Sequence, residues 1–288
     1  MDEATARAAA QAAAHAFGAR AGPVTRVRGG ASPLYDVTLA DARRLALRLH
    51  GPATDPRHVE DGARLSEALA DAGLATPWPQ RARDHALTVA VPGAVATALQ
   101  WIPATSLKGA PDPAHLHAVG VLLADFHLTA RAVAPRDLCL PDRRPTLPVI
   151  HDPALSHGAD AARAALSALQ DAPTGVVMDN PGAVLSGTDG LWLIGLERAG
   201  PGWPAQDLAA ALWAHGAALW AHGDVPDLST RRDALVAGYV AGGGNPRDAL
   251  PDRIALCLSL RALHAAAAAP RDSTARARAV ALAGGLPG

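Results

Sequence analysis

The chain contains little cysteine and almost no lysine. Its 288 residues include two cysteines, Cys139 and Cys257, whose separation fits no metal-ligand spacing. A disulfide framework and a zinc site are therefore not expected. Lys108 is the only lysine, and every other basic side chain except histidine is arginine. Any mechanism that needs a lysine has one candidate.

Long hydrophobic runs and an excess of charge are also missing. No run of about 18 uncharged apolar residues occurs, which argues against a membrane-spanning helix. The net charge of -1 gives no attraction to nucleic acid or to anionic lipid. Asp2 and Glu3 precede the alanine-rich stretch 4–16, where an export signal would carry cations, so a helix is expected there. We therefore expect a soluble, cytoplasmic protein that binds neither nucleic acid nor membrane.

Hydrophobic periodicity predicts a small sheet in the first hundred residues. Apolar and polar residues alternate in strands expected at 24–28, 34–39, 45–49, 87–91 and 96–102. Turns are expected at Gly29-Gly30, near Asp41 and at Pro92-Gly93. Apolar residues at helical spacing over 57–72 predict one helix between the third and fourth strands.

After Pro103 the pattern becomes mainly helical. Helices are expected over 115–130, over 159–169 and through most of the chain from Asp207, with a short strand pair between 176 and 196. The sequence thus predicts an α+β fold with an N-terminal lobe at 1–102, made of a helix, an antiparallel sheet and one further helix. A larger, mainly helical C-terminal lobe is expected at 103–288.

Five segments carry a family resemblance. They are the strand 45–50 (LALRLH), the helix end 69–77 (LADAGLATP), the lobe junction 99–103 (LQWIP), the helix stretch 120–127 (GVLLADFH) and the segment 191–209, which ends in Asp207-Leu208-Ala209. In this order and at these intervals they resemble the aminoglycoside phosphotransferase and choline kinase family. That family has a two-lobed, protein-kinase-like fold, and the resemblance covers roughly residues 24–240.

The resemblance implies phosphoryl transfer from a nucleotide to a small-molecule hydroxyl. In the family a His-x-Asp-x-x-x-x-Asn loop and an Ile-Asp-Phe or Ile-Asp-Trp strand end supply the catalytic and metal-binding groups. Laid on this chain without a gap, the loop has Val176 at the histidine, Met178 at the catalytic aspartate and Ala183 at the metal-binding asparagine. Gly195 stands at the aspartate of the strand end. The catalytic loop is therefore degenerate, and no catalytic residue or metal site is expected.

Three nearby residues are candidate substitutes. Asp179 and Asn180 follow the Met178 position, and a register shifted by one would bring Asp179 to the catalytic place. A polar turn before Pro181 is the simpler interpretation of both residues. Glu197 lies two residues after Gly195 and is a candidate metal ligand, while a solvated or ion-paired glutamate is the simpler interpretation.

The resemblance also implies nucleotide-binding residues. Arg48 stands where many relatives carry the phosphate-binding lysine, and its expected helix partner is Glu60 or Asp61. The other expected nucleotide-binding residues are Gly29, Gly30 and Ser32, whose turn is equally a plain hairpin, and Gln100, Trp101 and Ile102 at the lobe junction. His127 is expected to be a packed or hydrogen-bonded structural residue.

Three functional hypotheses follow. The first is a pseudokinase that has lost cofactor-dependent transfer and serves as a scaffold for a protein partner or a small molecule. The second is an active small-molecule kinase that uses ATP and Mg²⁺ with Asp179, Asn180 and Glu197 as substitute residues. The third is a stable subunit that partners an active relative.

Overall fold

The computed structural model divides into two compact units. It describes residues 2–19, 24–28, 32–106, 112–169, 172–178, 180, 183–220, 228–269, 273, 276–277 and 279–280. The first unit comprises Met1–Ala104, Ala132–Pro141 and Gly187–Arg198, and the second comprises Thr105–Arg131, Asp142–Ser186 and Ala199–Gly288. The first unit thus takes in two later segments besides the N-terminal stretch expected to end at residue 102.

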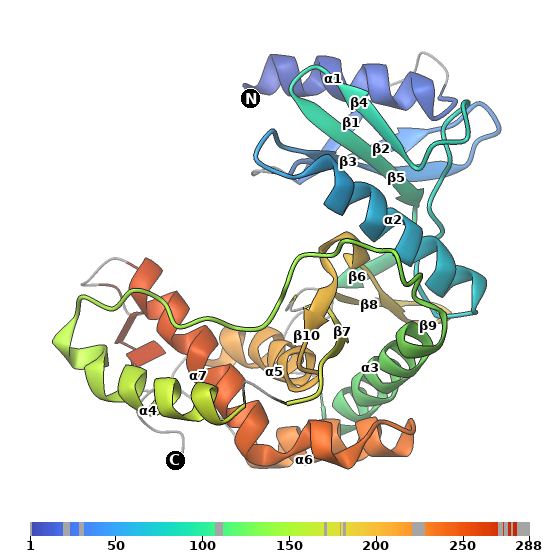
Figure 1. Ribbon diagram of the computed structural model, residues 1–288. Coiled ribbons are helices and arrows are strands. Elements are labelled where there is room, and N and C mark those ends of the chain that lie inside the picture. The colour runs from blue at the N-terminus through green and yellow to red at the C-terminus, as the bar shows by residue number, and fades with distance from the viewer. Residues whose placement is uncertain are drawn as a thin grey trace. The chain divides into compact units, whose positions relative to one another are not determined.

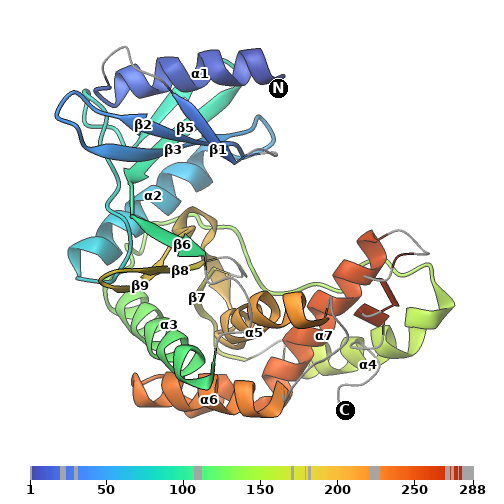
Figure 2. The same ribbon diagram turned by 180° about the vertical axis from the view of Figure 1, so that it is seen from behind.

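The first unit is built on an antiparallel sheet of five strands. These are β1 (Thr25–Arg28), β2 (Leu34–Thr38), β3 (Arg44–His50), β4 (Thr88–Val91) and β5 (Ala94–Gln100), in the order β1-β2-β3-β5-β4. Helices α1 (Glu3–Ala16) and α2 (Pro56–Asp71) cover opposite faces of the sheet (Figures 1 and 2). Strand β9 (Gly190–Leu193) and the 3-10 helix η2 (Leu196–Arg198) also belong to this unit.

Alternation along the central strand β3 separates a core face from a polar face. Leu45, Leu47 and Leu49 are at most 2% exposed and join the hydrophobic cluster that includes the alanines of α1. Side chains alternate along a strand, so Arg48 and His50 lie on the other face. The sequence pattern of β3 therefore decides which side of the sheet carries the charged group.

The sheet differs from its prediction at one strand. The turn near Asp41 is confirmed and contains Ala42 at φ +69°. At Pro92-Gly93, however, the hairpin is tight and Val91 already pairs with Ala94, so β5 begins two residues earlier than expected and ends at Gln100. The predicted bounds 96–102 are wrong because Gly93, at φ +72°, allows a two-residue turn. The expected turn at Gly29-Gly30 lies outside the described residues.

The second unit is mainly helical. Its helices are α3 (Pro113–Val133, of which the last two residues belong to the first unit), α4 (Ser156–Ala168), α5 (Ala205–Trp220), α6 (Leu228–Ala241) and α7 (Pro251–Ala268). Its short elements are β7 (Gly175–Val177), β10 (Gly200–Gly202), η1 (Pro153–Leu155), η3 (Pro246–Ala249) and most of β6 (Ala104–Ser106) and β8 (Val184–Gly187), of which Ala104 and Gly187 belong to the first unit. The α+β fold class is confirmed, with seven α-helices and a five-stranded antiparallel sheet in the described part of the chain.

Helix α3 is a core helix of the second unit. Among the described residues it is the one helix long and apolar enough to cross a membrane by length and composition, and half of that apolar stretch is buried. Glycines let α6 contact it closely: a Cβ on Gly120 would lie 2.1 Å from the Leu235 carbonyl oxygen, and one on Gly238 would lie 1.9 Å from that of His117. Larger residues at these positions would force the two backbones apart.

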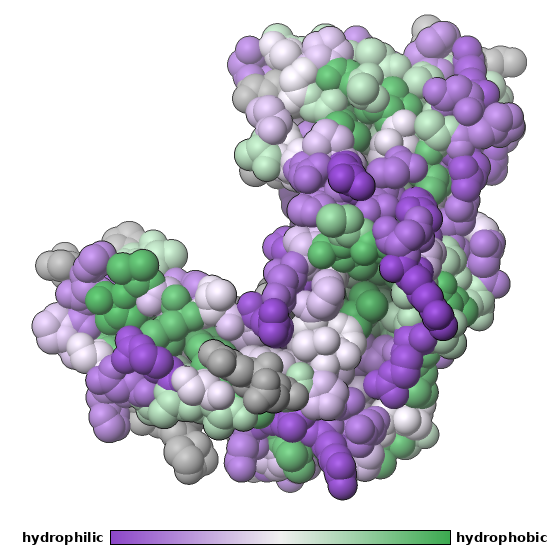
Figure 3. All heavy atoms as spheres, viewed as in Figure 1, coloured by the Kyte–Doolittle hydropathy of each residue, from purple (hydrophilic) through white to green (hydrophobic). Residues whose placement is uncertain are grey.

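Helices α4 and α7 form a separate apolar cluster in the same unit. Leu260 and Leu263 of α7 are at most 1% exposed and pack with Ala162 of α4. Hydrophobic residues also reach the surface over this part of the unit (Figure 3). Val149, just before α4, is 75% exposed. Isolated exposed apolar residues are common on protein surfaces and carry no site by themselves.

Candidate functional site

Arg48 forms an ion pair with Glu197. Strand β3 places Arg48 between β2 and β5, opposite Leu34 and Thr97. One guanidinium nitrogen, Nη1, donates to Oε1 of Glu197. The two side chains are 17% and 9% exposed, so water screens this pair less than a surface pair. The cation expected to hold phosphate is thus already bound to a carboxylate.

The prediction that Glu60 or Asp61 pairs with Arg48 was wrong. Glu60 instead accepts a hydrogen bond from Oγ1 of Thr88 at 2.5 Å. Asp61 accepts from Nη1 of Arg64 at 3.1 Å and from the backbone N–H of Cys139 at 2.8 Å. Both of these carboxylates therefore have other partners, and the alternative interpretation of Glu197 as an ion-paired residue is confirmed.

Backbone contacts fix the position of Glu197. A Cβ on Gly62 would lie 2.7 Å from Cα of Glu197, so α2 packs directly on the backbone of η2. Just before η2, the backbone N–H of Leu193 donates to the Ala75 carbonyl at 2.8 Å, and Oγ1 of Thr76 donates to the Leu193 carbonyl at the same distance. The carboxylate of Glu197 therefore projects from a segment that is held on both sides.

His50 lies on the same face of β3 as Arg48 and is 5% exposed. Its Nε2 lies 2.9 Å from Oγ1 of Thr97. The pKa of the imidazole is lowered from 6.5 to about 4, chiefly by burial, while the charge of Glu197 raises it and that of Arg48 lowers it. The ring is therefore neutral at pH 7, and Arg48 is the cation that pairs with Glu197. The i, i+2 spacing of Arg48 and His50 on a strand was the sequence signal for this neighbour.

In the second unit, two of the three residues aligned with the family's catalytic loop are apolar and buried. Val176 lies in β7, which pairs with β10, and is half-buried. Met178 and Ala183 are each 2% exposed. The thioether of Met178 and the methyl group of Ala183 neither accept a proton at neutral pH nor bind a hard cation. Asp179 lies outside the described residues.

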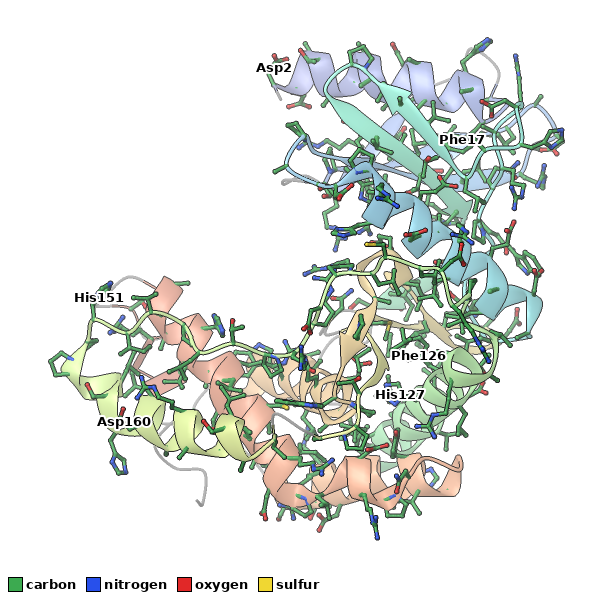
Figure 4. All side chains as sticks on the ribbon, in the orientation of Figure 1. Asp2, Phe17, Phe126, His127, His151 and Asp160 are labelled. Carbon is green, nitrogen blue, oxygen red and sulfur yellow. The ribbon has the colours of Figure 1, made fainter. Side chains whose placement is uncertain are left out.

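Asp207 supports this loop from α5. Its two carboxylate oxygens each lie 3.1 Å from the backbone nitrogen of Met178, which donates to them. His127 of α3 donates from Nε2 to Oδ2 of the same carboxylate at 3.1 Å, and its Nδ1 lies 3.0 Å from the hydroxyl of Tyr239. Figure 4 labels His127 and the neighbouring Phe126 on α3. His127 is 6% exposed and is hydrogen-bonded through both ring nitrogens, which confirms the prediction of a packed or hydrogen-bonded structural residue.

The lobe-junction residues lie in the first unit. The backbone N–H of Gln100 donates to the Trp78 carbonyl at 2.8 Å, and that of Trp101 donates to the Arg44 carbonyl at 3.1 Å. The Arg44 guanidinium stacks 4.3 Å from the centroid of the Trp101 ring. Ile102 is 9% exposed. These contacts order the junction; a nucleotide-binding role for its residues stays a prediction.

Three further candidate residues lie in the described part of the chain. Ser32 and Asn180 are half-buried. Gly195 is buried, and its backbone has φ +86°. Gly29 and Gly30 lie outside the described residues. Within the described part of the chain, no three His, Cys, Asp or Glu residues gather in a way that could hold a metal ion. Sequence reasoning missed Gly62 and Thr97, since neither carries a chemical signal of its own.

Comparison with solved structures shows a shared fold. An amicoumacin kinase in complex with AMP-PNP, Ca²⁺ and Ami has a TM-score of 0.77 at 14% identity, over 100% of this chain and 95% of that chain. A microcompartment-associated aminopropanol kinase has a TM-score of 0.74 at 16% identity, over 96% and 94%. A choline/ethanolamine kinase family protein from Mesorhizobium loti has a TM-score of 0.58 at 19% identity, over 96% and 90%.

Sequence comparison identifies the family. No curated protein matches the chain significantly. The sequence profile of the phosphotransferase enzyme family does match it, over residues 23–257, which include the sheet of the first unit, Met178 and α5. The chain therefore belongs to the phosphotransferase enzyme family.

Proposed function

We propose that this chain is a pseudokinase of the family, a scaffold that binds a protein partner or a small molecule without transferring a phosphoryl group. The observation that carries the proposal is the joint replacement of four positions. Where the family has His, Asp, Asn and Asp, this chain has Val176, Met178, Ala183 and Gly195. The burial of Met178 and Ala183 supports an apolar role for both.

Phosphoryl transfer to a hydroxyl needs a group that takes the hydroxyl proton. The thioether of Met178 cannot take it, and removal of a positioned general base costs on the order of 10² to 10⁴ in rate. The second need is a divalent cation on the phosphates, held in kinases by an aspartate and an asparagine. Magnesium prefers oxygen ligands, and neither Ala183 nor Gly195 has a side-chain oxygen. The residues at these positions therefore do not fit Mg²⁺.

Glu197 is the described carboxylate nearest in sequence to the Gly195 position. Its bond to Arg48 argues against a role as a metal ligand, because the charge of the guanidinium repels a cation from the same poorly exposed carboxylate. The alternative of an active kinase that uses Asp179, Asn180 and Glu197 requires Glu197 to hold a metal ion beside Arg48. It also requires a base from Asp179.

Calorimetric titration of ATP into the purified protein, with and without Mg²⁺, tests the proposal together with a turnover assay over a panel of hydroxyl acceptors. We expect no steady ATP turnover and no gain in ATP affinity from Mg²⁺. Turnover at enzymatic rates that is lost in Asp179→Ala or Glu197→Ala would establish the active alternative and overturn the proposal.

A matched control restores the family residues. The triple variant Met178→Asp, Ala183→Asn, Gly195→Asp returns the base and both metal ligands to their expected places. Asp tolerates the left-handed backbone of residue 195 better than most side chains. A gain of Mg²⁺-dependent ATP binding in this variant alone would support the proposal. Mg²⁺-dependent binding by the natural chain would contradict it. Size-exclusion chromatography of the chain co-expressed with an active relative distinguishes a partner subunit from a lone ligand binder.

A further inference from the structure

We draw no further inference here: the strongest candidate, the surface patch of partly buried apolar side chains beside the α4–α7 cluster that includes Leu147, Ile150 and Leu166, is an unpartnered face, and nothing in the described part of the chain shows what covers it.

Discussion

Gly62 of α2 lies directly against the backbone of Glu197, and a Cβ at residue 62 would be 2.7 Å from Cα of Glu197. The contact joins a helix of the N-terminal stretch to a residue more than a hundred positions later. It lets α2 reach the segment that carries the partner of Arg48. The glycine is thus required by the close approach of two backbones.

Gly62→Ala should therefore destabilise the protein. In an unpacked helix interior this change stabilises by about 1 kcal/mol, because alanine has the higher helix propensity. Here the added methyl group meets backbone, and overpacking of this kind costs about 1–3 kcal/mol. Urea unfolding followed by circular dichroism measures the difference. Arg57→Ala, at an exposed position of the same helix, should change stability little; a stabilised Gly62→Ala would show that the contact is absent.

Arg48 and Glu197 should be energetically coupled. Arg48→Met and Glu197→Gln each leave a charged group of low exposure without its partner, so each should lower the free energy of unfolding. The double variant should lose less than the sum, with a coupling of about 1–3 kcal/mol. A double-mutant cycle from denaturant unfolding gives this value. Additive losses would mean that the two side chains do not interact in solution.

Stability should fall in acid partly through His50. Its pKa is lowered from 6.5 to about 4 in the folded state, so between these values the unfolded chain binds a proton that the folded chain does not. The free energy of unfolding therefore rises with pH across this window, and the contribution of His50 to stability is lost as the pH falls through it. The contribution is up to roughly 3 kcal/mol by the pKa difference.

Unfolding at pH 7.5 and pH 5 in the natural chain and in His50→Gln isolates this term. The glutamine variant has no imidazole to titrate, so it should lose less stability than the natural chain between the two pH values. An identical loss in both proteins would assign the acid sensitivity to other groups.

Asp207 should be required for the stability of the second unit. Asp207→Ala removes the acceptor for the Met178 backbone N–H and for His127, and both donors are buried. Unsatisfied buried donors cost about 1–3 kcal/mol each, so a loss of several kcal/mol is expected. Thermal and urea unfolding measure it. Asp160→Ala is the control, because that exposed side chain of α4 (Figure 4) is 71% accessible and should change stability little.

Local pattern was sufficient for most of the secondary structure. Alternation over 34–50 predicted β2 and β3, and the alanine-rich start of the chain predicted α1. The bounds of β5 were misplaced because the tightness of the Pro92-Gly93 turn depends on which residues of the two strands pair. Pairing is a property of two segments, and the periodicity of one segment does not contain it.

In the candidate site too, sequence predicted where residues lie along the chain, and packing decided which of them meet. The resemblance placed Arg48 on a strand and Met178 and Ala183 on a loop, and the structure has Arg48 in β3 and both apolar side chains buried. It gave Arg48 the wrong partner, since Glu60 and Asp61 are acidic residues of the adjacent helix in sequence and Glu197 is 149 positions away. A side chain pairs with the carboxylate that the packed chain brings within reach, whatever the sequence separation.

By itself the sequence determined the α+β class and the family, because these depend on residue types and their local order. It also predicts that Val176, Met178, Ala183 and Gly195 stand where the family has proton-accepting and metal-binding residues. Only the tertiary structure decided that Glu197 pairs with Arg48, that Gly62 must lack a side chain and that Asp207 holds the Met178 backbone. Each of these depends on distances between segments far apart in the chain, and such distances are set by packing.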